Sequence, residues 1–119
     1  ERNKMRLNDI LEEAKHRMMT YVRPMLKANP YSPGYYVIGY GHVISGTERS
    51  LKIGKVGDHI SSFRITKEEA ESLLMEDLER HFKTLRLQKK LPEQEGAAIE
   101  AVVKMALRYV PTLMKRKVV

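Results

Sequence analysis

Hydrophobic residues recur every three or four positions as far as Val22 and every second position from Tyr35 onward. This change of period constrains the fold more than any other feature of the sequence. Upstream of the change, the helical spacing predicts an amphipathic helix whose apolar positions are Leu7, Ile10, Leu11, Ala14, Met18, Met19 and Val22. We expect Asn8 to cap the start of this helix and Pro24 to end or kink it.

A small sheet is predicted after the helix. Residues 29–34 contain Asn, Ser, Gly and two Pro and are typical of a turn. Residues 35–45 are rich in Tyr, Val and Ile at period two, which predicts β-structure interrupted by Gly39 and Gly41. Residues 51–56 are the candidate for a short third strand.

Two further helices are predicted in the second half. Thr66 followed three residues later by Glu69 is the pattern of a capping box. One apolar face follows it, formed by Ala70, Leu73, Leu74, Leu78 and Phe82. Pro92 suits the first turn of another helix, which is apolar on nearly every side over residues 97–110 and is therefore expected to be buried. The fold class is α+β, in a single domain over residues 1–119.

Composition excludes some kinds of site and favours one kind of partner. The absence of cysteine excludes disulfides and thiolate metal sites. The four histidines do not have metal-ligand spacing, so no metal or other cofactor is expected. No apolar run approaches the length of a membrane span, and no signal peptide is visible after Glu1. The net charge of +7 favours anionic polymers, although scattered Lys and Arg also serve simply to keep a protein soluble.

Two motifs in the same order resemble the phage lysozymes of glycoside hydrolase family 24. The first is the hairpin sequence GYYVIGYGH at residues 34–42, and the second is the helix sequence ITKEEAESLL at residues 65–74, followed by Asp77. The resemblance covers roughly residues 19–107. It implies a lysozyme-like fold with an N-terminal helix, a small hairpin sheet and then helices. Family members usually continue with further helices after the position of Val110, so we expect a shortened C-terminal lobe or a wall supplied by a partner.

The catalytic residues of that family are not carried over. Its members cut the glycan strand of peptidoglycan with a glutamate at the end of the first helix, an aspartate, and a threonine in the hairpin. The threonine position is Val37 here; fifteen residues earlier is Val22, and six earlier is Tyr31. None of the three ionises near neutral pH. The nearest upstream carboxylates, Glu12 and Glu13, precede Val22 by about 14 Å of helix.

Scaffold residues of the family are retained. His42 and Asp77 match a histidine–aspartate pair that joins the hairpin to the following helix, and the resemblance implies a structural pair here. Four tyrosines lie in or near the predicted hairpin: Tyr31, Tyr35, Tyr36 and Tyr40. They suit contacts with a partner or stacking on sugar rings, and they equally suit ordinary packing along the hairpin.

These observations predict a catalytically inactive lysozyme-like protein that acts as a binding or structural module. The expected partner is a protein, a second copy bound through the apolar C-terminal helix, or peptidoglycan glycan. The alternative is an active muramidase with a displaced catalytic acid. Binding to nucleic acid rests on charge alone and is the least favoured class. The resemblance implies a phage-encoded protein made in the bacterial cytoplasm, with a place in the virion or in the regulation of lysis.

Overall fold

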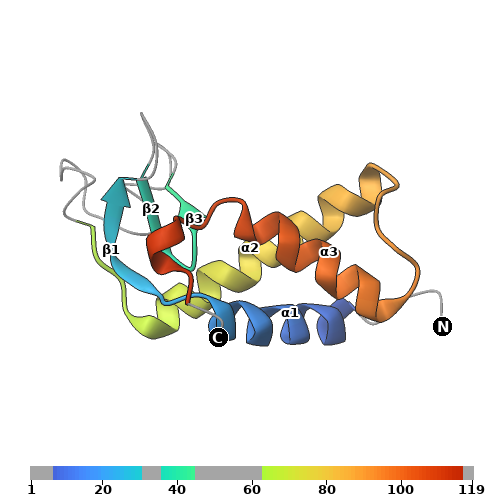
Figure 1. Cartoon of the computed structure of the whole chain (residues 1–119), viewed down its shortest axis with the longest axis horizontal. Coiled ribbons are helices and arrows are strands. Elements are labelled where there is room, and N and C mark those ends of the chain that lie inside the picture. Colours follow the sequence, from blue (N-terminus) through green and yellow to red (C-terminus); the bar gives the residue numbers. More distant parts are fainter. Residues whose placement is uncertain (1–6, 31–35, 45–62, 117–119) are drawn as a thin grey trace.

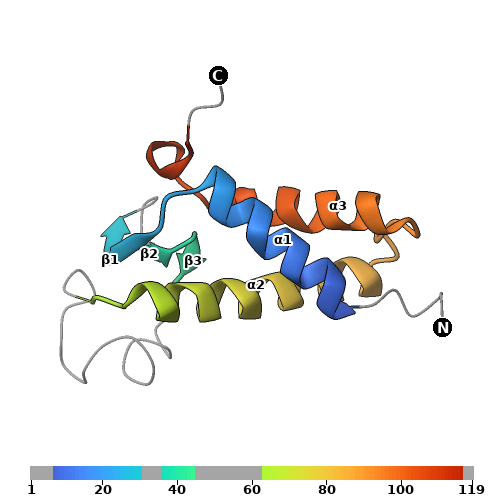
Figure 2. The ribbon, with the colours of Figure 1, turned by 90° about the horizontal axis from the view of Figure 1, so that it is seen from below.

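The computed structural model describes residues 7–30, 36–44 and 63–116. Three helices pack against one another, and a three-stranded antiparallel sheet lies at one end of them (Figures 1 and 2). The predicted α+β class and the order of helix, hairpin and helices are confirmed. Within the described ranges, no helix is long and apolar enough to cross a membrane.

The first helix, α1 (Leu7–Tyr21), buries the apolar stripe that the sequence predicts: Ile10, Leu11, Ala14 and Met18. It ends before Pro24, whose ring is incompatible with a continuing helix. The prediction that Asn8 caps the helix is wrong, because Asn8 lies within it.

The sheet has the strand order β1–β2–β3. Its hairpin consists of β2 (Tyr36–Gly39) and β3 (His42–Val43), so the strand is interrupted at the glycines as predicted. The third strand is β1 (Met25–Pro30), which the sequence pattern does not predict. The candidate strand at residues 51–56 lies outside the described residues. The sequence predicts a turn at Asn29 and Pro30, but in the structure both residues belong to β1. They pair across the sheet with Val37 and Tyr36, respectively.

The second helix, α2 (Lys67–Leu87), begins at the predicted capping box. Glu69 N–H donates to the Thr66 hydroxyl at 3.0 Å, and Thr66 N–H donates to the Glu69 carboxylate at 2.8 Å. These two bonds satisfy donors that the first turn of a helix leaves unpaired. All five predicted apolar positions of this helix are buried.

The third helix, α3 (Glu95–Leu107), differs from its prediction in two ways. Its N-cap is Gln94, so Pro92 precedes the helix instead of occupying its first turn. It is also one-sided: it buries Ala98, Ile99, Val102, Val103 and Ala106 against α1 and α2. Its exposed positions carry small or charged side chains, namely Ala97, Glu100 and Lys104. The predicted all-round apolar surface is therefore wrong, and this helix presents no large exposed hydrophobic side chain to a partner.

Two glycines allow the hairpin to approach the helices closely. Gly39 has a φ of +67° beside Ala70 of α2, and Gly41 has a φ of +96° beside the end of α3. A Cβ at Gly41 would lie 2.7 Å from Val110 Cγ2 and 3.3 Å from the Tyr109 carbonyl oxygen. The hairpin is thus fixed in its place by contacts that a larger residue would prevent.

Gly41→Ala is expected to lower the free energy of unfolding by about 2–4 kcal/mol, because it combines a strained backbone with a clash in the core. Gly96 is the matched control: it lies in α3, and nothing lies within 4 Å of an added Cβ. Gly96→Ala should raise stability by about 0.4–1 kcal/mol. Urea denaturation measures both; equal midpoints for the two variants would contradict the close approach.

Candidate functional site

The junction between hairpin and α2 contains the histidine and aspartate that the sequence singles out. His42 Nδ1 lies 2.9 Å from Asp77 Oδ2 and 3.0 Å from Oδ1, and both side chains are buried. β3 supplies the histidine, and α2 supplies the aspartate from its inner face. The predicted pairing is therefore present as a direct hydrogen bond in which the ring N–H donates to the carboxylate.

Asp77 has a second partner. Arg80, one turn later in α2, donates to Asp77 Oδ1 at 3.0 Å and keeps most of its side chain in solvent. The carboxylate therefore accepts hydrogen bonds from His42 and from Arg80. A buried carboxylate held in this way is suited to fixing two elements together.

Asp77→Ala is expected to lower the free energy of unfolding by about 1–3 kcal/mol, since it leaves the buried His42 ring without this partner. Glu79→Ala is the control on the same helix: it removes an exposed ion pair with Lys83, in which the atoms are 3.3 Å apart, and should cost at most about 0.5 kcal/mol. Thermal unfolding of both variants measures the difference. Equal decreases in stability for the two variants would show that the buried pair contributes no more to stability than the exposed ion pair does.

A second buried histidine extends this cluster. His81 stacks on Tyr109, with ring centroids 5.9 Å apart and planes inclined by 6°. Burial lowers the pKa of His81, the Arg80 and Arg108 charges lower it further, and Asp77 opposes them. The sequence pattern assigns no role to His81, although its place four residues after Asp77 puts both on one helical face.

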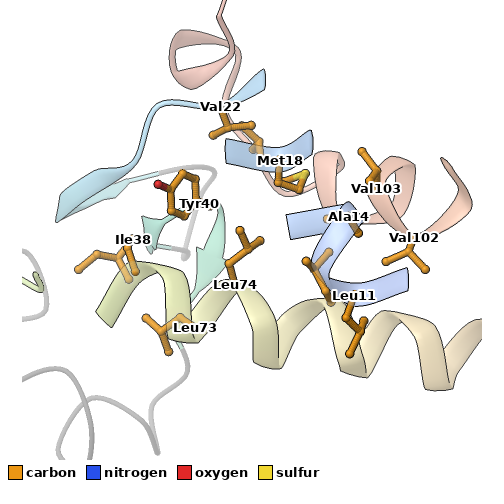
Figure 3. Packing of buried hydrophobic residues seen from close by; sticks show 14 of the residues in the cluster. Leu11, Ala14, Met18, Val22, Ile38, Tyr40, Leu73, Leu74, Val102 and Val103 are labelled. Atoms are coloured by element: carbon orange, nitrogen blue, oxygen red, sulfur yellow. The ribbon is translucent and has the colours of Figure 1, made fainter. Parts of the chain in front are cut away.

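The positions that match the family's acid and threonine are inside the protein. Val22 and Val37 are both fully buried. Figure 3 shows Val22 beside Met18 at the end of α1, among the core side chains. Residues 21–23 pair with the C-terminal segment: Arg23 N–H donates to the Met114 carbonyl at 2.8 Å, and Arg116 N–H donates to the Tyr21 carbonyl at 2.7 Å. The position that the resemblance aligns with the family's catalytic glutamate is therefore buried, and the backbone on either side of it pairs with the C-terminal segment.

Two of the four tyrosines named above can be located. Tyr40 is only 4% exposed and belongs to the core, so its ring does not offer a face to a sugar. Tyr36 is half-buried and packs against the same core. Tyr31, which matches the family's aspartate, and Tyr35 lie outside the described residues. Of the two alternatives, ordinary packing therefore applies to Tyr40, whose side chain points into the core (Figure 3).

Acidic groups near the hairpin are few. Asp77 is the one buried carboxylate among the described residues. Burial, and then the Glu71 carboxylate, raise the pKa of Tyr40, while Arg116 lowers it. Glu71 is partly exposed and lies 3.9 Å from the ammonium of Lys15. Glu71 is therefore one carboxylate at which a displaced-acid mechanism can be tested.

The described part of the chain contains no cluster of three or more His, Asp or Glu side chains that could hold a metal ion. The candidate site in this part of the chain is the buried pair of His42 and Asp77, with Arg80 bonded to it from the solvent side, which joins the hairpin to α2.

Comparisons with known proteins add no assignment to this description. No family model matches the chain, and neither a curated protein nor a solved structure matches it.

Proposed function

We propose that this protein is a catalytically inactive lysozyme-like module that acts by binding or as a structural component. The observation that carries the proposal is the full burial of Val22 in the core, where its backbone also pairs with the C-terminal segment. An enzyme that protonates a glycosidic oxygen needs an acid that faces a cleft. At this position the chain has an apolar side chain that solvent does not reach.

The retained junction supports a module that keeps the lysozyme-like scaffold. His42 and Asp77 are hydrogen-bonded, and Gly41 allows the hairpin to meet the end of α3. Both features stabilise the position of the hairpin and neither requires catalysis. A protein selected only for binding or assembly would preserve such contacts while its reactive groups are replaced.

The partner is a protein or the glycan of peptidoglycan. Self-association through α3 has little support, because Ala97, Glu100 and Lys104 occupy its exposed face. Tyr40 is buried in the core and its ring is therefore not accessible for stacking on a glycan. A protein partner is therefore favoured over glycan.

The test uses purified peptidoglycan and the full chain. Release of soluble fragments measures cleavage, and sedimentation of the protein with the insoluble polymer measures binding. We expect no release of fragments. Release that Glu71→Gln abolishes would replace the proposal with the displaced-acid muramidase.

A further inference from the structure

The short 3-10 turn η4 (Thr112–Met114) presents an unusual side chain to solvent. Leu113 at its tip is 90% exposed, although Met114 beside it is buried in the core and anchors the turn. The turn is also held by backbone hydrogen bonds from Met114 N–H to the Pro111 carbonyl at 2.9 Å and from Arg23 N–H to the Met114 carbonyl at 2.8 Å. The leucine is therefore exposed on a fixed support.

Positive charges surround this turn. Arg23, Lys115 and Arg116 are exposed, and the backbone pairing of residues 21–23 with 114–116 brings them to one place. None of the three forms an ion pair with another residue in the described ranges. Tyr21, which is 40% exposed, lies in the same pairing. We call these residues the junction patch: Tyr21, Arg23, Leu113, Lys115 and Arg116.

The sequence around the junction patch contains no acid. Residues 21–30 and 101–116 have Lys and Arg but neither Asp nor Glu. Further along β1, Lys27 lies directly opposite Arg64 in an antiparallel bridge. Like charges facing each other across strands destabilise a sheet. An anionic partner would remove this repulsion, so the charge pattern favours such a partner.

Leu87, another exposed leucine, provides a contrast. It is 83% exposed at the far end of α2, away from η4 (Figures 1 and 2). The loop after it has Lys89 and Lys90, but Glu93 and Glu95 follow closely. Leu113 lies in a stretch of sequence without acids, as does the less exposed Leu26, whereas Leu87 does not.

We propose that the junction patch binds the surface of a membrane that contains anionic lipids. Leu113 would enter the boundary between headgroups and acyl chains, and the three cations would contact lipid phosphates. A phosphate backbone of nucleic acid would satisfy the cations but would leave Leu113 in water. The turn stands out from the helices in Figure 2, where it can meet a broad surface. This inference does not depend on the absence of catalysis.

The experiment is co-sedimentation of the full chain with vesicles of equal parts phosphatidylglycerol and phosphatidylcholine. Vesicles of phosphatidylcholine alone and a duplex DNA oligonucleotide are the comparison ligands. We expect binding to the anionic vesicles, weakened by salt. Leu113→Ser should weaken it by about tenfold. Lys115→Gln should weaken it by about fivefold. Leu87→Ser and Lys89→Gln are the matched controls and should leave binding unchanged.

Several results would overturn the proposal. One is absence of binding to the anionic vesicles while circular dichroism shows a folded protein. Another is an equal loss of binding in Leu113→Ser and Leu87→Ser. Binding to the duplex without binding to vesicles would assign the positive charge to nucleic acid instead. If Leu113→Ser fails to fold, Lys115→Gln compared with Lys89→Gln still decides whether the junction patch is the contact.

Discussion

The purified protein is expected to leave the cell wall intact when outer-membrane-stripped bacteria are mixed with it beside an active phage lysozyme. Val22 and Val37 neither ionise nor reach solvent. General acid–base assistance contributes about 10²–10⁴-fold to reactions of this kind, so its loss should leave no measurable clearing. Turbidity measures the rate, and equal protein concentrations make the comparison direct.

The control for this experiment is a carboxylate whose charge acts on Tyr40 of the hairpin. After burial, Glu71 is the next cause of the raised pKa of Tyr40, and it is partly exposed, so we test it as a displaced acid. Clearing at even a few per cent of the lysozyme rate, and its disappearance in Glu71→Gln, would contradict the inactive assignment. Glu100→Gln changes an exposed carboxylate on α3 and should have no effect in either case.

Local sequence signals predicted the helices well. The capping box at Thr66 and the apolar spacing of α2 and α1 are properties of short segments, and each appears in the structure as expected. The hairpin followed from its alternating residues and its glycines. The contact of His42 with Asp77 spans 35 residues and was inferred from the resemblance, because no local pattern indicates it.

Features that depend on distant partners were missed. β1 has no regular alternation, and it is formed by pairing with β2 on one side and by the bridge from Lys27 to Arg64 on the other. The backbone pairing of Val22 with Lys115 joins segments that are far apart in the chain. The exposed face of α3 was misjudged because alanines count as apolar in a pattern but present little surface to a partner.

The burial of Val22 predicts a large effect for Val22→Glu, the substitution that restores the family's catalytic acid. Val22 is fully buried and pairs with Lys115 through the backbone. Transfer of a carboxylate from water to such a position raises its pKa by several units. At pH 7 the variant should lose about 3–5 kcal/mol of unfolding free energy, a large part of the stability of a small domain.

The pH dependence of stability separates the cost of burying a charge from the cost of fitting a larger side chain into the core. A carboxyl group whose pKa is raised in the folded state binds protons more tightly there, so the folded state of Val22→Glu gains stability as the pH falls towards 4.5. Val22→Gln has a similar shape without the charge and should not gain in this way. Urea denaturation of both variants at pH 7 and pH 4.5, each compared with the wild type, measures the difference.

If Val22→Glu has the same stability at both pH values after this comparison, its carboxylate reaches water. Position 22 would then face an opening, and the restored acid could meet a glycan. If the pH dependence appears, position 22 is closed to water in the folded protein, and a glutamate there has no access to a glycan.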